Sequence, residues 1–211
     1  KLAVSLMDKV GSRECAGEVI CFGTQVRAYV EPLQAALECH YDGYVAAMAS
    51  GDMIQAAANI LFRNNNLSLS GMNLQTAHEK CAVAVDFMYE RKILIFMIQV
   101  QCVQRSVFKL IGTNETPKYE SAEVDNILAT NNSVMATNYF HKAYISFMFR
   151  LFDDSKHYTE KYLDCAVNTW ANLFLNHAFH AFYMGLISFW LARKSEEGQQ
   201  WRERGKRSQL A

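Results

Sequence analysis

Proline and glycine are scarce in this sequence, with 2 and 10 occurrences in 211 residues. Both residue types interrupt regular structure, so their scarcity favours long helices over many short strands. The chain also lacks net charge, because 21 basic and 21 acidic residues balance. This balance argues against nucleic acid or a membrane as a partner. Hydrophobic residues make up 51% of the chain, which argues against disorder and predicts a sizeable core.

Motifs for nucleotide chemistry are missing. The sequence contains no GxxxxGK[ST], no GxGxxG and no kinase catalytic-loop or DFG pattern. The six cysteines form no CxxC pair, and no histidine lies at zinc-finger spacing from one. Most of them fall on apolar stripes, where a free thiol behaves as a small hydrophobe. We therefore expect a cytoplasmic protein without a bound cofactor or metal.

No targeting or membrane-spanning segment is visible. The chain starts within a helical pattern, so we interpret it as a segment of a longer polypeptide. Two apolar runs, Ile93–Val103 and Ala178–Ala192, are shorter than the roughly 18 to 20 residues that a bilayer span needs. We expect both runs to belong to buried helices.

The stretch Pro32–Asn66 predicts two helices folded back on each other at Ser50-Gly51-Asp52. Pro32 suits a first helical turn, Gly51 suits the left-handed position that ends a helix, and Asp52 suits a cap. Alanines on both arms predict a close helix–helix contact. Apolar residues recur at helical spacing on the first arm; they are Leu33, Ala36, Leu37, His40, Tyr44, Ala47 and Met48.

The rest of the chain continues this pattern. Gly112–Tyr119 is the clearest loop, and Asp153-Asp154-Ser155 predicts the turn of a second hairpin. Its first arm carries Ala136, Phe140, Ala143, Tyr144, Phe147 and Leu151 on one face, and its second arm Tyr158, Tyr162, Cys165, Ala166, Thr169, Trp170 and Leu173. Further helices are predicted from Ser12 to about Val30, from Asn73, over Ile93–Ile111, over Ser121–Leu128 and from Asn176, with Phe179, Phe182, Leu186, Phe189 and Trp190 inward.

These elements predict an all-α fold of about eight to ten antiparallel helices, stacked as a right-handed solenoid of the tetratricopeptide type. The Gly51 and Asp153 turns lie 102 positions apart, near three periods of the 34-residue tetratricopeptide repeat, although intermediate turns do not keep that period. We expect a single domain over residues 1–211, with possible sub-groups 1–112 and 120–211.

Two groups of residues invite a chemical interpretation. His177 and His180 share a helix face at i, i+3 spacing, but without further ligands they are better interpreted as core histidines than as a metal site. Asp153 and Asp154 faintly resemble the DDxxD motif of helical terpene synthases, but His157 replaces the last carboxylate and no second metal motif follows. Helix capping explains the two aspartates more simply. We expect no catalysis in this segment.

Aromatic stripes and a basic C-terminal segment are the candidates for partner binding. We interpret the stripes first as core, with an exposed fraction able to contact a partner helix. The segment Arg193–Arg207 carries six basic and three acidic residues, typical of a solvated helix face or of a docking helix. The candidate partner-binding residues are Tyr144, Phe147, Tyr158, Tyr162, Trp201 and Arg202.

Four stretches taken together resemble a known region: VEPLQAALECHYDGYVAAMASGDMIQAA, LSLSGMNL, KAYISFMFRLFDDSKHYTEKYL and HAFHAFYMGLISFWLARKSEEGQQWRERG. They are similar to the tetratricopeptide-like helical region of large signalling proteins, in which it lies between an AAA-type ATPase module and sensor, histidine-kinase or cyclase domains. The resemblance covers nearly the whole chain. The family's ATP-binding and phospho-acceptor residues lie in other domains, and His141, His177 and His180 stand in no phosphorylation motif.

The resemblance implies a non-catalytic scaffold or regulatory module whose partners are the neighbouring ATPase and kinase domains or a peptide. Two rival hypotheses remain open from the residues alone. One is a stand-alone peptide-binding helical adaptor, which requires an open groove lined by aromatic side chains. The other is a helical prenyl-diphosphate enzyme, motivated only by Asp153 and Asp154.

Overall fold

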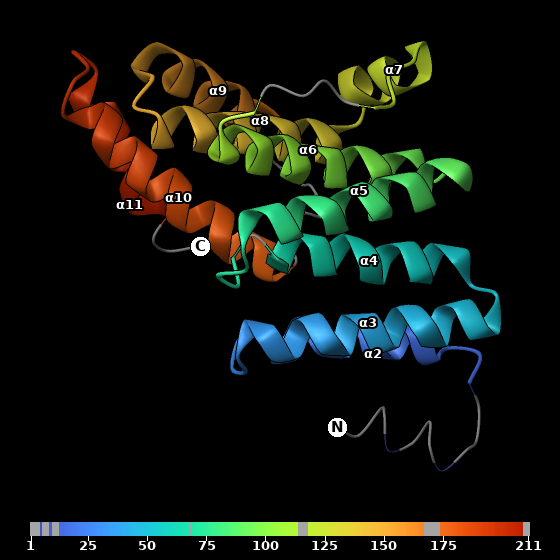
Figure 1. The fold of residues 1–211 in the computed structure, drawn as a ribbon. Helices are drawn as coiled ribbons and strands as arrows, with labels where there is room; N and C mark the ends of the chain where they lie inside the picture. Colours follow the sequence, from blue (N-terminus) through green and yellow to red (C-terminus); the bar gives the residue numbers. More distant parts are fainter. Residues whose placement is uncertain are drawn as a thin grey trace. The chain divides into compact units, whose positions relative to one another are not determined.

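The computed structural model describes residues 5, 9, 13–67, 69–113, 118–166 and 174–208 (Figure 1). Ten helices have assigned bounds and no strand occurs within these residues, so the all-α prediction is confirmed for them. The internal contacts divide the chain into unit 1, Lys1–Glu120, and unit 2, Ser121–Ala211. This boundary follows directly after the predicted loop at 112–119.

Unit 1 contains five described helices that pack mainly against their neighbours in the chain. Helix α2 packs on α3 and α4, α3 on α4, α4 on α5 and α6, and α5 on α6. Consecutive helices reverse direction, as Figure 1 shows for α3 and α4. The helices are α2 (Ala16–Arg27), α3 (Leu33–Ser50), α4 (Met53–Leu67), α5 (Leu74–Glu90) and α6 (Leu94–Ile111).

The predicted α3–α4 hairpin and its turn residues are confirmed. Gly51 has a φ of 78°, and the N–H of Asp52 donates to the carbonyl of Ala47 at 2.9 Å. The side chain of Asp52 then accepts a hydrogen bond from the N–H of Gln55 at 3.0 Å, which caps α4. Ala47, Ala56 and Ala57 are completely buried, so the small-residue contact is present.

Helix α6 is largely buried, as predicted for the run Ile93–Val103, although the buried share of α4 is slightly larger. It begins one residue after the predicted start, and its buried residues include Met97, Ile98 and Val100. Its 18 residues are long and apolar enough to cross a membrane, but 56% of them are buried inside the structure. A core helix of a water-soluble protein can have the same length and composition, so this is weak evidence for a membrane span.

Unit 2 also contains five described helices. Helix α8 packs on α9, α10 on α11, and α10 on both α8 and α9. Ser121 caps α7 and Asn131 caps α8, each by accepting a hydrogen bond from a backbone N–H three residues later. The helices are α7 (Ala122–Thr130), α8 (Asn132–Met148), α9 (Phe152–Cys165), α10 (Leu175–Ala192) and α11 (Gly198–Ser208).

The second hairpin turns earlier than predicted. Residue Arg150 takes the left-handed conformation with a φ of 60°, and α9 begins at Phe152. Asp153 and Asp154 therefore lie in the first turn of α9, where the helix dipole favours negative charge, and they do not form the turn. The prediction was wrong because it relied on residue types that favour turns, whereas an arginine occupies the turn here.

The core of unit 2 is formed by α8, α9, α10 and α11. Phe140 and Trp201 are completely buried at its centre. Three residues that the sequence placed inward are instead exposed, namely Leu151 at 49%, Phe182 at 59% and Leu186 at 41%. Helix α10 is apolar on most of its circumference, so periodicity could not select the stripe that is buried; its buried residues are His180, Met184, Gly185, Ile187, Ser188, Leu191 and Ala192. The predicted inward residues Thr169, Trp170 and Leu173 lie outside the described residues.

Candidate functional site

The aromatic network of unit 2 has Phe140 of α8 at its centre. The imidazole of His180 stacks on the Phe140 ring at a centroid distance of 3.6 Å and an angle of 20°. Phe179 and Tyr162 approach the same ring, at 5.6 Å and 6.0 Å. Three helices therefore meet at one buried ring, which fixes the relative positions of α8, α9 and α10.

Two polar side chains within this network face each other. The hydroxyl of Tyr162 and Nδ1 of His180 are 3.5 Å apart. Burial, together with the nearby imidazoles of His141 and His177, lowers the pKa of His180 well below its ordinary value. Burial raises the pKa of Tyr162 to about 12. At neutral pH this pair is therefore a neutral imidazole beside a neutral phenol, and it serves the packing of the core.

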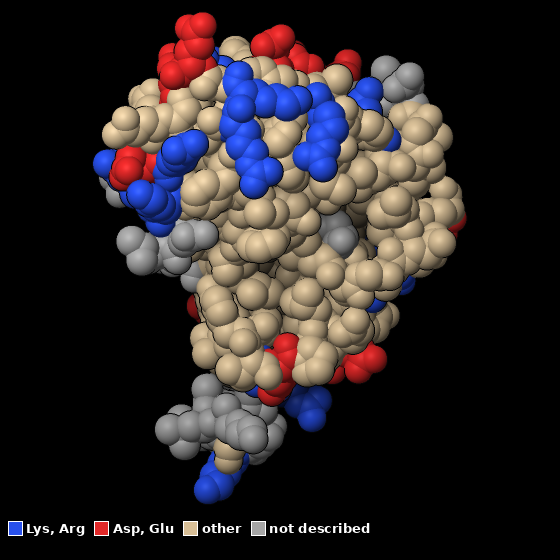
Figure 2. Space-filling model, turned by 90° about the vertical axis from the view of Figure 1, so that its left-hand side faces the viewer, with Lys and Arg blue, Asp and Glu red and all other residues tan. Residues whose placement is uncertain are grey.

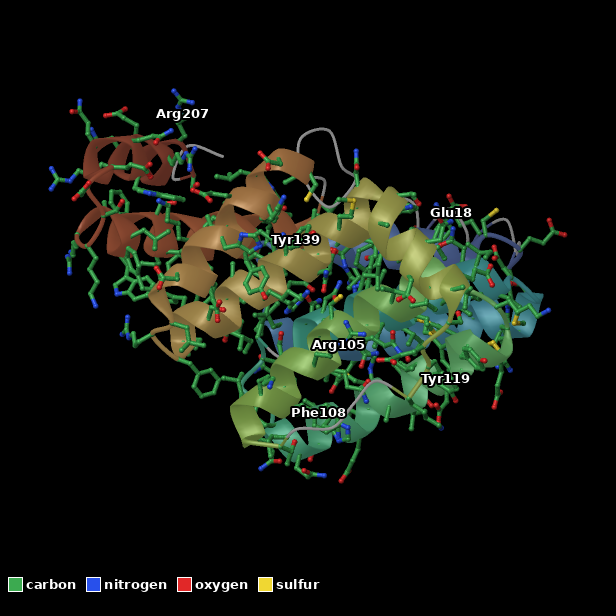
Figure 3. All side chains as sticks on the ribbon, turned by 90° about the horizontal axis from the view of Figure 1, so that it is seen from above. Glu18, Arg105, Phe108, Tyr119, Tyr139 and Arg207 are labelled. Atoms are coloured by element: carbon green, nitrogen blue, oxygen red, sulfur yellow. The ribbon has the colours of Figure 1, made fainter. Side chains whose placement is uncertain are left out.

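Half-buried aromatic rings lie at the edge of the network under a cation. Tyr139 of α8 and Tyr158 of α9 stack at a centroid distance of 6.5 Å, and Figure 3 labels Tyr139. The ammonium group of Lys142 lies 5.9 Å from the Tyr139 ring and 5.4 Å from the Tyr158 ring. Lys142 is exposed and the two tyrosines are half-buried, so the ammonium group and part of each ring lie at the surface.

A second set of cations surrounds Trp190 of α10. Its indole packs edge-on against Phe147 of α8 and Phe152 of α9, at 5.4 Å and 5.6 Å. The guanidinium of Arg150 and the ammonium of Lys194 lie 5.9 Å and 5.7 Å from the same ring. Trp190 thus joins the α8–α9 turn to the end of α10.

The structure separates the six predicted partner-binding residues into three groups. Tyr144, Phe147 and Tyr158 are half-buried at the edge of the aromatic network, whereas Arg202 is exposed on α11. Tyr144 packs on Tyr183 at 4.8 Å.

Tyr162 and Trp201 form the remaining group, which lies in the core. Their exposed fractions are 6% and 0%, so they offer almost no surface to a partner in this conformation. The guanidinium of Arg204 lies 4.5 Å from the Trp201 ring. Sequence reasoning missed Lys142 and Arg150, whose only signal was a basic residue three positions after an aromatic one.

The groups considered for metal chemistry do not converge. His180 is 5% exposed and faces Tyr162, while Asp153 and Asp154 lie at the start of α9. Among the described residues, no group of three or more histidine, cysteine, aspartate or glutamate side chains could hold a metal ion. All six cysteines are free thiols.

Unit 1 contains a buried polar network that the sequence did not predict as a unit. His40 of α3 is completely buried between Gln25 of α2 and Asn59 of α4. Its Nε2 lies 2.8 Å from Nε2 of Gln25, and its Nδ1 lies 3.2 Å from Oδ1 of Asn59. The amide nitrogen of Asn59 donates to the carbonyls of Gly17 and Gln55, at 3.0 Å and 2.9 Å. Three helices are therefore joined through one imidazole.

The protonation state of this network follows from its geometry. Because both donor hydrogens of Asn59 are used, its oxygen faces His40 and requires an N–H on Nδ1. The amide nitrogen of Gln25 then donates to an unprotonated Nε2. Burial lowers the pKa of His40 to about 4, with the cations Arg27 and Arg63 acting in the same direction. His40 is therefore neutral at physiological pH, and its role is structural.

A third polar cluster lies near the C-terminal end of unit 1 and joins Asp86 of α5 to Lys118 and Tyr119. Lys118 donates to both carboxylate oxygens of Asp86 at 2.8 Å, and the hydroxyl of Tyr119 donates to one of them at 2.8 Å. The ring of Tyr119 stacks on Tyr89 at 3.7 Å. Burial opposes ionisation of Asp86, but the hydrogen bonds from Lys118 and Tyr119 outweigh it and lower the pKa. The cluster fastens the end of the 112–119 loop to α5.

Comparisons of this chain with protein-family models, with curated proteins and with solved structures find no match.

Proposed function

We propose that this chain is a non-catalytic helical scaffold or regulatory module that acts by binding another protein. The observation that carries the proposal is the edge of unit 2, where Lys142 lies over Tyr139 and Tyr158. Aromatic rings held in place by packing are the side chains that protein interfaces use most, because they add contact area at a low cost in conformational entropy. A cation above them adds preference for a partner with carboxylates.

Four of the predicted partner-binding residues belong to this surface or lie on exposed helix positions. Tyr144, Phe147 and Tyr158 are half-buried and therefore keep part of each ring at the surface, and Arg202 is exposed. Tyr162 and Trp201 support these residues from the core. A partner can therefore reach these four residues, but it cannot reach Tyr162 or Trp201.

We place the chain within a large signalling protein in the cytoplasm. In this proposal the helices form a tetratricopeptide-like solenoid that couples an ATPase module to a histidine-kinase or cyclase output domain. The support is the resemblance in sequence, the helical hairpins within each unit and the six free thiols, which suit a reducing compartment. A stand-alone peptide-binding adaptor would use the same edge of unit 2.

The proposed setting is tested by sequencing the parent transcript across both ends of this segment. A phosphate-loop ATPase module upstream and a kinase or cyclase downstream are the expected result. An open reading frame that starts and stops near these ends would favour the adaptor. Turnover of a nucleotide by the isolated chain would contradict the non-catalytic assignment.

The proposed surface is tested by calorimetric titration of the chain with each flanking domain that the transcript encodes. Lys142→Glu is expected to weaken binding about tenfold or more, because reversing an interface charge turns attraction into repulsion. Lys92→Glu in unit 1 is the matched control, since Lys92 is also exposed and lies at a helix–helix turn. Equal affinities for the two variants would place the contact elsewhere.

A further inference from the structure

Two helix–helix turns of this chain have the same backbone geometry but differ in the two residues that precede the left-handed position. Lys92 and Arg150 are the described non-glycine residues with positive φ, at 56° and 60°. In each turn the next N–H donates to a carbonyl five residues earlier, at 2.9 Å from Ile93 and 2.8 Å from Leu151. A left-handed residue with this hydrogen bond is the Schellman arrangement that ends many helices.

The neighbours of the two residues differ in polarity. Lys92 follows Glu90 and Arg91, which are charged and exposed. Arg150 is surrounded by Met148, Phe149 and Leu151, whose exposed fractions are 46%, 51% and 49%. We call Met148–Leu151 the tip of unit 2. The residue after the left-handed position is apolar in both turns (Ile93 and Leu151), as the Schellman arrangement favours. The two positions before it are Glu90 and Arg91 in one turn and Met148 and Phe149 in the other, so reversal of the chain does not explain the exposed Met148 and Phe149.

The tip carries a positive charge at Arg150, and two negative charges follow it in the chain. The Arg150 guanidinium lies 5.2 Å from the Phe147 ring and forms no ion pair with any described residue. Asp153 and Asp154, in the first turn of α9, are exposed and likewise form no ion pair within the described part of the chain. Figure 2 shows the charged side chains on one face of the molecule, with basic and acidic groups close together in places and uncharged surface between them.

We propose that the tip of unit 2 binds the tip of a second copy of this chain across a twofold axis. In such a contact the same patch must be complementary to itself. In the proposed contact, Arg150 of each copy faces Asp153 and Asp154 of the other. Phe149 of each copy packs against the tip of the other copy. An acidic peptide or an anionic lipid surface would be attracted by Arg150 but repelled by the two aspartates, so a second copy fits the charges better.

The tip does not include Lys142, Tyr139 or Tyr158, although Arg150 lies over Phe147. The variants Lys142→Glu and Arg150→Glu therefore test the two proposals separately. The small size of the tip implies a weak dimer, since stable interfaces bury about 1,200 Å² or more in total. Self-association would double the valency of the chain and so strengthen any contact made by the partner surface.

The test is sedimentation velocity on the full chain over a range of about 5 to 500 µM, a span suited to weak complexes. The wild type is expected to shift from monomer to dimer within that range. Arg150→Glu alone is expected to weaken association at least tenfold, and so is the double variant Asp153→Lys with Asp154→Lys. Lys92→Glu reverses the charge of an equivalent turn in unit 1 and is expected to leave association unchanged.

Mixing the two unlike variants gives the decisive result. In the mixture, the glutamate introduced into one variant faces the two lysines introduced into the other. The Arg150 kept by the second variant faces the Asp153 and Asp154 kept by the first, so opposite charges meet on both sides of the contact. The heterodimer is therefore expected to recover while each variant alone stays monomeric. Circular dichroism melts establish that every variant is folded.

Three results would overturn the proposal: a wild type that stays monomeric throughout, variants that all dimerise like the wild type, or a mixture that fails to associate. Phe149→Ser tests the apolar part separately, and an unchanged dimer in that variant would also contradict it. Co-sedimentation of the wild type with phosphatidylserine vesicles, lost in Arg150→Glu, would assign the tip to a membrane surface instead.

Discussion

The imidazole of His40 and the side-chain amide of Asn59 form a hydrogen bond of 3.2 Å that joins α3 to α4 inside unit 1. A glycine makes this contact possible, because a Cβ at Gly43 would overlap the Oδ1 of Asn59. The network is fully paired around Asn59, so its members stabilise one arrangement of three helices and penalise others. A change that disturbs this bond therefore affects unit 1 as a whole.

Substitution of the glycine is expected to be costly. Gly43→Ala should lower the free energy of unfolding by about 1–3 kcal/mol, because overpacking displaces Asn59 and outweighs the better helix propensity of alanine. Gly23→Ala is the matched control on α2, since a Cβ there meets nothing within 4 Å. That control should stabilise the protein by about 0.5–1 kcal/mol. Urea denaturation followed by circular dichroism measures both, and equal shifts would contradict the proposed role of the contact.

The acid sensitivity of unit 1 should follow His40. Its folded pKa of about 4 lies below the ordinary value of 6.5, so the unfolded chain binds the proton first as the pH falls. The contribution of neutral His40 to the free energy of unfolding is fully present above pH 6.5. It falls between pH 6.5 and pH 4 by about 1.4 kcal/mol per pH unit, and by about 3 kcal/mol in all. Below pH 4 this contribution to the slope ends.

NMR titration of the imidazole measures this directly. The His40 ring signals should stay constant from pH 8 to about 5 in the folded protein, because the folded pKa is depressed by burial. A His40 midpoint near 6.5 would show that the ring is solvated and that the network is open in solution.

The sequence predicted those features that depend on one residue or on neighbours in the chain. Gly51 and Asp52 predicted the α3–α4 turn, because glycine is typical of the left-handed residue that ends a helix and aspartate is typical of the residue that caps the next one. Features that depend on partners from separate helices were not predictable. His40 was placed on the buried stripe of α3, but Gln25 and Asn59 come from α2 and α4, and nothing in their spacing links the three.

The candidate site shows the same limit. Aromatic stripes predicted a core containing Phe140 and Tyr162, which the structure contains. The position of Lys142 over two rings depends on how α8 and α9 are rotated against each other, which periodicity does not determine. Arg150 was missed for another reason, since arginine carries no preference for the left-handed conformation that it adopts.

The cluster around Asp86 should determine whether the end of the 112–119 loop stays attached to α5. Asp86→Asn keeps the shape of the side chain but removes the charge that holds Lys118 and accepts from Tyr119. Trypsin should then cleave after Lys118 about tenfold faster or more, because local opening becomes easier. Mass spectrometry of the digest measures the rate of this cleavage, with the exposed Asp125→Asn as control. An unchanged cleavage rate would show that the stacking of Tyr119 on Tyr89 is sufficient.

Lys92 and Arg150, the two basic residues with a left-handed backbone conformation, should respond differently to replacement by glycine. Lys92→Gly relieves the steric cost of a Cβ at φ 56°, so it should stabilise unit 1 by about 0.5–1 kcal/mol. Arg150→Gly relieves the same cost but also removes the guanidinium from the rings of Phe147 and Trp190, a loss of about 0.5–1 kcal/mol. Its net effect on unit 2 should therefore be close to zero. Hydrogen exchange in denaturant, recorded separately for α5–α6 and α8–α9 peptides, distinguishes the two units, and an equal gain at both positions would mean that the stacking of Arg150 contributes nothing to stability.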